Sequence, residues 1–411
     1  MKRLLYITVS ALAALFLCAS SCDKPDNGNT LPPPPDPGTE TPGGDNGEDN
    51  TGNGNNENSG STGTLCTDIG QTPIVLAYYT ENSPSLPDVT LLTHINYAHG
   101  RFADPTNGTG GIVIAKPELM QKVLDLKSRN PKLKVMLMIG GWGMRADGFS
   151  MMAKDPDKRK EFCESVKGHL DKYGLDGVDI DWEYPTYSAE GTGADPNDTR
   201  NFNTLLKELR ETIGTGKIIS FASSASAKYV DWKTAIQYID YVNVMTYDMG
   251  AAPSGHNSPL HRSTIFNQRS CEESVELHLK AGIPLNRQNL GVPFYGKAEK
   301  NPAVKIYEYE VNYNEMASIL EKNYYAKGKK DVTGYNIRKW DDVAKVPYLT
   351  DIAGHNLLSY DDPESVACKG EFAMSKGLLG AMFWEYRHDD DQQSLLKALV
   401  KAMYGKETTI Q

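Results

Sequence analysis

Short apolar segments alternate with longer amphipathic segments over most of this chain. Eight apolar segments predict strands, at residues 74–79, 94–102, 134–140, 177–182, 217–223, 241–247, 290–295 and 378–385. Most of them are rich in Val, Ile and aromatic residues, and many lack polar alternation, which is typical of strands buried on both faces. The pattern restricts the chain to α/β folds in which helices cover a parallel sheet.

The intervening segments predict helices. They lie at residues 116–129, 155–173, 198–213, 271–282, 362–377 and 391–403. Several begin near Asp or Ser, which are common helix starts. Eight strands in one repeating unit of about 345 residues favour a closed (β/α)8 TIM barrel. A doubly wound open sheet is the alternative, but no G-x-G-x-x-G turn follows the first strand.

One interval is too long for a single helical crossover. The last two predicted strands are separated by about 80 residues, whereas a crossover with its helix needs far fewer. This interval includes the segments VKIYEYEVNY and SILEKNYYAK. We therefore expect residues 298–358 to form a small α+β insertion between the seventh and eighth strands, at the end of the barrel that carries active sites.

The first 22 residues have the features of an export signal. Lys2 and Arg3 precede an apolar run, 4–17, that is too short to cross a bilayer comfortably. Small residues then lead directly to Cys22, which resembles a bacterial lipoprotein signal with a lipidated cysteine. The usual leucine three places earlier is Ala19 here, so an ordinary signal peptide is the alternative. We expect export and a lipid anchor at Cys22 in the outer membrane, on the cell-surface or periplasmic side.

Residues 23–64 contain almost no apolar side chains. Such a segment cannot bury enough surface to offset its ordering entropy, so we expect a disordered linker. The linker holds eight acids and one lysine, a net charge of −7 out of −10 for the whole chain. The chain has no basic patch, which argues against a nucleic-acid partner. Residues 65–411 are then the barrel with its insertion, which we expect to be a monomer.

The cysteines beyond the linker predict neither a metal site nor a particular disulfide. Cys66, Cys163, Cys271 and Cys368 are widely spaced and include no C-x-x-C pair. Export permits disulfides. The last three, however, lie in predicted helices, where a buried thiol is common.

Residues 176–185, DGVDIDWEYP, place acids at alternate positions. Asp179, Asp181 and Glu183 share one strand face, and the apolar residues between them share the other. In a barrel the acidic face points inward, with Glu183 nearest the end where catalytic residues lie. Confined carboxylates resist ionising together, so at least one pKa should rise and keep a proton for donation. The alternatives are a solvated face, which an internal strand lacks, and a hard-cation site, for which no loop geometry is present.

The same ten residues resemble the D-G-x-D-x-D-x-E signature of the glycoside hydrolase family 18 chitinases. The resemblance covers nearly all of residues 70–400, because further segments follow in the family's order: THINYAHG, KVMLMIGGWG, YVNVMTYDMG, LGVPFYGKA and LLGAMFWEYRHDD. It implies a catalytic TIM barrel that hydrolyses β-1,4 linkages between N-acetylglucosamine units of chitin or chitooligosaccharides. The products would retain their anomeric configuration, and neither a cofactor nor a metal would be needed.

The resemblance also implies roles for the acids. Glu183 would be the general acid and base, Asp181 would hold the substrate's 2-acetamido group, and Asp179 would share a proton with Asp181. The acetamido oxygen would attack the anomeric carbon in place of a protein nucleophile, giving an oxazolinium intermediate. Tyr247 would orient the acetamido carbonyl group.

Six further positions carry over as substrate-binding residues. An aromatic face packs well on a pyranose, so Trp384 would form the floor under the sugar at subsite −1. Tyr78 would approach Asp179. The remaining four would line the cleft, although plain packing is an equal alternative for the last two: Asp248, Met245, Trp142 and Tyr295.

Three positions depart from the family pattern. Met138 stands where Ser is common and cannot donate a hydrogen bond to Asp179. His99 stands where an aromatic residue is usual, and Lys297 replaces an Arg. None of these changes removes the acid or the acetamido clamp, so we expect activity with an altered rate or pH profile.

Two other functions remain open at this stage. An endo-β-N-acetylglucosaminidase acting on N-glycan cores would use the same chemistry, although the W-E-Y-P context and the insertion favour a chitinase. A non-catalytic glycan-binding lipoprotein on the same fold is the other alternative. Retention of Glu183 counts against that second alternative.

Overall fold

The computed structural model describes residues 65–188, 192–300, 309–320, 337–351 and 353–405. All of them fall within one compact unit, Ser59–Gln411. The predicted export signal, the lipidated Cys22 and the predicted linker lie outside the described residues.

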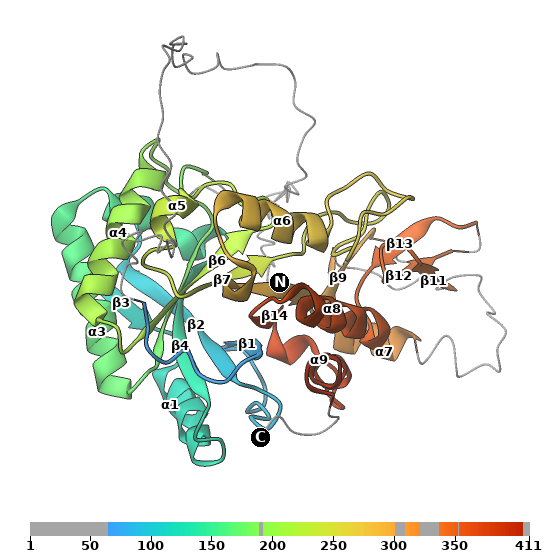
Figure 1. Cartoon of the computed structure of the whole chain (residues 1–411), viewed down its shortest axis with the longest axis horizontal. Coiled ribbons are helices and arrows are strands. Elements are labelled where there is room, and N and C mark those ends of the chain that lie inside the picture. Colours follow the sequence, from blue (N-terminus) through green and yellow to red (C-terminus); the bar gives the residue numbers. More distant parts are fainter. Residues whose placement is uncertain (1–64, 189–191, 301–308, 321–336, 352, 406–411) are drawn as a thin grey trace, which may run out of the picture. The chain divides into compact units, whose positions relative to one another are not determined.

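A closed barrel of eight parallel strands organises the described residues (Figure 1). β1 closes the barrel because it pairs with both β14 and β2. The short strand β3 (Thr109–Ile114) adds to β2 as an antiparallel hairpin. The predicted TIM barrel is therefore confirmed. Around the barrel the strands are β1 (Ile74–Thr80), β2 (His94–Asp104), β4 (Lys134–Gly141), β5 (Gly177–Trp182), β6 (Ile218–Ser224), β7 (Tyr241–Met245), β8 (Gln288–Pro293) and β14 (Gly380–Trp384).

Helices follow most of these strands and begin at local sequence signals. Asp155 accepts hydrogen bonds from two backbone N–H groups at the start of α3, and Ser270 forms a reciprocal capping box with Glu273 at the start of α6. Proline at the first turn of α3 and α8 fits the helical φ without losing a hydrogen bond. The helices are α1 (Pro117–Asp125), α2 (Phe149–Ala153), α3 (Pro156–Tyr173), α4 (Asp198–Ile213), α5 (Trp232–Ala235), α6 (Cys271–Ala281), α8 (Pro363–Lys376) and α9 (Ser394–Tyr404).

The apolar core lies between the barrel and the helices. Trp182, on the outer face of β5, is 2% exposed. Its ring stacks on Phe149 of α2 at a centroid distance of 5.3 Å and meets Phe202 of α4 at 5.6 Å. A separate cluster of mostly apolar and aromatic side chains, including Met138 and Tyr241, fills the barrel interior. The alternation of β5 therefore places Val178, Ile180 and Trp182 in the outer core and leaves the intervening acids facing the barrel interior.

The chain between β8 and β14 forms a second, antiparallel sheet. Its strands are β9 (Tyr295–Ala298), β10 (Glu310–Asn312), β11 (Ile337–Asp341), β12 (Val346–Thr350) and β13 (Asn356–Ser359), in the order β10-β9-β13-β12-β11. Helix α7 (Tyr313–Leu320) follows β10. The sheet begins at residue 295, before the predicted bound of 298, because Tyr295 already pairs with Asn312. Parts of the predicted insertion, 301–308, 321–336 and 352, lie outside the described residues.

The cysteines at positions 66, 163, 271 and 368 are thiols. Across the part of the chain that the structure describes, no helix combines the length and apolar character needed to cross a bilayer.

Candidate active site

The three predicted acids line the barrel interior at the end of β5. Asp179 and Asp181 lie on the strand, and Glu183 follows its last residue. Their exposed fractions rise from 0% through 4% to 9% toward the open end of the barrel. In the described part of the chain, no group of three or more His, Cys, Asp or Glu side chains is arranged to hold a metal ion.

Asp179 is held by side chains from three other strands. The hydroxyl group of Tyr78 on β1 donates to Oδ2 at 2.9 Å. Ser220 on β6 donates to Oδ1 at 2.5 Å, and the Nδ2 group of Asn243 on β7 donates to the same oxygen at 3.0 Å. Burial raises the pKa of Asp179 to about 6, although these hydrogen bonds lower it. The group can therefore gain or lose a proton close to neutral pH.

Sequence reasoning missed Ser220 and Asn243. Met138 lies beside Asp179 in the strand register and is fully buried, so it contributes packing at this point. Ser220 and Asn243 donate hydrogen bonds to Asp179, which Met138 cannot do. Each is a buried polar residue at an inward position of a largely apolar strand. That was the available signal, because a buried polar side chain requires a partner.

Asp181 and Glu183 form the outer end of the row. Burial, then the charges of Glu183 and Asp179, raise the pKa of Asp181 well above its usual range. Burial also raises the pKa of Glu183 to about 7; Asp248 adds to the rise, and hydrogen bonds from Tyr184 and Asp181 oppose it. Glu183 can therefore carry a proton near neutral pH, as a general acid must.

Tyr247 follows β7 and reaches the same interior space. It is 8% exposed, and its ring lies 6.0 Å from that of Tyr295. Burial and the surrounding carboxylates, Asp181 and Glu183 first among them, raise the pKa of Tyr247 well above its usual range. Its hydroxyl group therefore stays protonated and can donate a hydrogen bond. Met245, also 8% exposed, belongs to the same interior cluster.

Trp384 lies at the end of β14, on the other side of the barrel from the acids. In the strand order β14 is the fourth strand from β5 in either direction, so the two strands are opposite each other. The indole ring lies 5.5 Å from Tyr78 and 6.3 Å from His99, measured between ring centroids. His99 is 2% exposed and pairs through Nδ1 with Glu81 at 2.8 Å. The ring of Trp384 therefore packs against side chains of β1 and β2, across the barrel from β5.

Asp248 and Trp142 lie nearer the rim. Asp248 has a left-handed backbone, with φ at 56°, and a half-exposed side chain. Its Oδ1 accepts a 2.9 Å hydrogen bond from the hydroxyl group of Tyr295. Trp142 is 39% exposed and meets only Tyr184 among nearby rings of the described residues, at 6.4 Å. The structure therefore brings the predicted site residues together except Trp142, which stands apart from the interior cluster.

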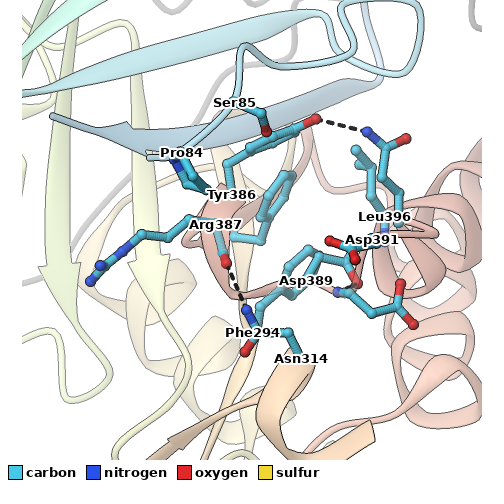
Figure 2. A pocket seen from close by; sticks show the side chains of 12 residues that line it. Pro84, Ser85, Phe294, Asn314, Tyr386, Arg387, Asp389, Asp391 and Leu396 are labelled. Atoms are coloured by element: carbon cyan, nitrogen blue, oxygen red, sulfur yellow. Dashed lines mark hydrogen bonds between the residues drawn. The ribbon is translucent and has the colours of Figure 1, made fainter. Parts of the chain in front are cut away.

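A separate cavity of about 160 Å³ lies outside the barrel (Figure 2). It is bounded by the chain after β1, by α7, and by the segment from β14 to α9. Asn314 donates to the carbonyl group of Arg387 at 3.2 Å across it. The half-buried Asp389 here already accepts the backbone N–H groups of Leu395 and Leu396 at the start of α9. None of the predicted site residues lines this cavity.

Comparisons with known proteins agree with this geometry. The family model for Glycosyl hydrolases family 18 matches residues 74–389. Chitinase A1 of Niallia circulans is 36% identical over 309 residues, which are 66% of this chain and 43% of that protein. A probable chitinase 2 of Drosophila melanogaster is 31% identical, covering 76% of this chain and 69% of the other. This chain therefore matches less than half of chitinase A1.

Two solved structures share the fold. A family 18 N-acetylglucosaminidase from Paenibacillus barengoltzii superposes with a TM-score of 0.68 at 31% identity, covering 80% of this chain and 99% of that one. The Group IV chitinase of Ostrinia furnacalis, solved with allosamidin, gives a TM-score of 0.68 at 29% identity, covering 81% and 99%. With its barrel, its acid row and these matches, the chain belongs to Glycosyl hydrolases family 18.

Proposed function

We propose that the protein is a chitinase that hydrolyses β-1,4 linkages between N-acetylglucosamine units with retention of configuration. The observation that carries the proposal is Glu183, a buried acid at the open end of β5 whose pKa is raised to about 7. A protonated acid at this position can deliver its proton to a glycosidic oxygen at neutral pH. The named chitinases among the relatives support the substrate class.

The sugar's own acetamido group is the proposed nucleophile. As Glu183 protonates the leaving oxygen, the acetamido carbonyl oxygen bonds to the anomeric carbon, and an oxazolinium ion forms with departure of the alcohol. Tyr247 would donate its hydroxyl hydrogen to that carbonyl oxygen and hold it in line. Asp181 would accept from the acetamido N–H group once its own proton has passed to Asp179, whose pKa of about 6 permits this transfer.

The second half of the reaction returns the enzyme to its starting state. The Glu183 carboxylate removes a proton from water, the water oxygen bonds to the anomeric carbon, and the oxazolinium ring opens to restore the acetamido group. The proton held by Asp179 returns to Asp181. Two displacements on the same carbon give net retention. Trp384, opposite the acid row, would support the apolar face of the sugar during both steps.

Replacement of the acid tests the proposal. Glu183→Gln keeps the shape of the side chain but removes the proton, so hydrolysis of chitotetraose should fall by roughly 10²–10⁴-fold while binding persists. The initial anomer of the product, followed by NMR, should be β. Full activity of the variant, an α product, or equally fast cleavage of a deacetylated chain would each refute the mechanism.

N-acetylglucosaminidase activity is a second candidate. It is favoured by the name of the solved family 18 relative from Paenibacillus barengoltzii. Release of monomer from chitooligosaccharides of four to six units would support it, whereas internal products would support the chitinase. A high-mannose glycoprotein assayed in parallel separates cleavage of N-glycan cores from both.

We also propose that the enzyme is exported and anchored by lipid at Cys22 to the outer membrane. The proposal rests on the sequence pattern before that cysteine. Metabolic labelling with a palmitate analogue should mark the wild-type protein and not Cys22→Ser. Labelling of neither protein, or of both, would contradict the assignment. We further propose a monomer, which light scattering would test.

A further inference from the structure

An ion triad connects the antiparallel insertion to the candidate active site. Lys297 on β9 and Glu310 on β10 are direct cross-strand neighbours. The Nζ group of Lys297 lies 3.0 Å from Oε2 of Glu310 and 3.0 Å from Oδ1 of Asp248, which follows β7 of the barrel. The lysine side chain is 12% exposed, whereas the two acids are about half exposed. One largely buried cation therefore joins two carboxylates from different parts of the fold.

Aromatic side chains surround this cation. Its Nζ group lies 5.1 Å from the ring centroid of Tyr295 and 5.2 Å from that of Tyr309. The hydroxyl group of Tyr295 donates to the same oxygen of Asp248 that Lys297 contacts. Although burial opposes it, the two carboxylates hold the pKa of Lys297 above its usual value. Lys297 is therefore charged throughout the pH range of enzymatic activity.

Asp248 is fixed on its other side by the barrel. Its backbone N–H group donates to Oδ1 of Asn257 at 2.9 Å, and its backbone is left-handed, which is unusual for a residue with a side chain. The orientation of its carboxylate consequently depends on partners rather than on strand geometry. Lys297 and Tyr295 are those partners among the described residues.

The carboxylate of Asp248 acts on Glu183 through its charge. The charged and titratable groups that face Glu183 are Asp181 on β5, Asp248 and Tyr247 after β7, Tyr184, and Arg145 after β4. Their effects on the pKa of Glu183 differ in direction: Asp248 raises it, whereas Arg145 lowers it. A cation bonded directly to Asp248 offsets the influence of that carboxylate.

We propose that Lys297 is a positioning residue that holds the Asp248 carboxylate, offsets its charge, and so lets the insertion set the acidity of the site. The inference rests on the proposed role of Glu183 as the general acid. Lys297 stands where the family pattern has Arg. Because it also pairs with Glu310, it links the insertion to the Asp248 carboxylate. The insertion then contributes to the chemistry without touching the reacting atoms.

Three full-length variants test the proposal. Lys297→Met removes the cation and leaves two uncompensated carboxylates, so Glu183 should hold its proton more tightly. The basic limb of kcat/KM on chitotetraose should move up by roughly 0.5–1 pH unit. Lys297→Arg should restore the wild-type limb. Glu310→Gln keeps the Lys297–Asp248 pair and should produce no upward shift.

A titration that needs no turnover separates this inference from the proposed function. Carboxyl-¹³C-glutamate NMR, with Glu183→Gln assigning the resonance of residue 183, should show the same upward shift in Lys297→Met. The inference would be overturned if Lys297→Met lost stability while the titration of Glu183 stayed unchanged. The same upward shift of the Glu183 titration in Glu310→Gln would also overturn it. A shifted titration in a protein that never cleaves chitooligosaccharides would instead overturn the proposed function and leave the electrostatic coupling standing.

Discussion

The hydroxyl group of Tyr78 donates a 2.9 Å hydrogen bond to Asp179 and so joins β1, the first strand of the barrel, to the acid row on β5. Both residues are essentially buried, at 1% and 0% exposed. The bond is charge-assisted when Asp179 is ionised. Together with Ser220 and Asn243, Tyr78 supplies the environment that Met138 cannot.

Ser220→Ala should therefore impair catalysis more than folding. Loss of one donor to a buried carboxylate destabilises its ionised form by about 1.5–3 kcal/mol. Asp179 should therefore stay protonated up to a higher pH, where it cannot take the proton of Asp181, and turnover near neutral pH should fall by about tenfold. The measurement is kcat on chitotetraose with a thermal melt. Ser223→Ala is the matched control, since Ser223 lies on the same strand but bonds His278 of α6. An equal loss of activity in the control would contradict this prediction.

The pH dependence of kcat/KM should be bell-shaped, with a maximum between about pH 6 and pH 7. Above about pH 7 Glu183 loses the proton that it must donate, so activity should fall tenfold per unit. Below about pH 6 Asp179 becomes protonated and can no longer take the proton of Asp181. Asp179→Asn cannot take this proton at any pH, so its activity should be low across the whole range. A wild-type profile that is flat from pH 5 to pH 9 would contradict the assignment of both groups.

Tyr247→Phe removes a hydrogen-bond donor and keeps the ring that packs near Tyr295. If the hydroxyl group orients the attacking acetamido oxygen, kcat should fall by roughly 10²-fold with little change in KM, as happens when a donor to a reacting oxygen is lost. Steady-state kinetics on chitotetraose give both values. A change confined to KM would indicate a binding role instead.

Replacing Trp384 should change substrate binding and replacing its neighbour Phe383 should change stability, because successive strand residues face opposite sides. Trp384→Ala should raise KM by about tenfold through loss of the sugar floor. Phe383 stacks on Phe294 outside the barrel, at 4.3 Å, so Phe383→Ala should cost about 3–5 kcal/mol of unfolding free energy and leave KM unchanged. Urea denaturation and kinetics on both variants would reveal whether the two faces are distinct.

The close approach of β6 explains why position 177 in the acidic motif is a glycine. A Cβ atom there would lie 2.2 Å from the carbonyl oxygen of Ile218 on β6, so Gly177→Ala should displace β5 and reduce both stability and activity. Gly168→Ala is the control, because nothing lies within 4 Å of that position in α3. It should be neutral or stabilising by about 0.5–1 kcal/mol. A well-folded, active Gly177→Ala enzyme would refute the packing argument.

Much of the fold and of the acid row could be predicted from short-range patterns. Period-two alternation placed Asp179, Asp181 and Glu183 inside the barrel and Trp182 outside, because it depends only on neighbouring residues. Helix starts such as Ser270 with Glu273 are equally local. The start of β9 at Tyr295 was not predictable, since it is set by pairing with Asn312, well along the chain.

The sequence by itself determined the acids, their spacing and the face that they share, since covalent geometry and strand alternation suffice for these. Only the tertiary structure decided which groups hold them. Barrel closure brings Tyr78, Ser220 and Asn243 around one carboxylate from more than 160 residues of chain, and the antiparallel sheet brings Lys297 to Asp248. The acidity of a buried carboxyl group depends on such neighbours, so it could not be predicted before the strands were paired.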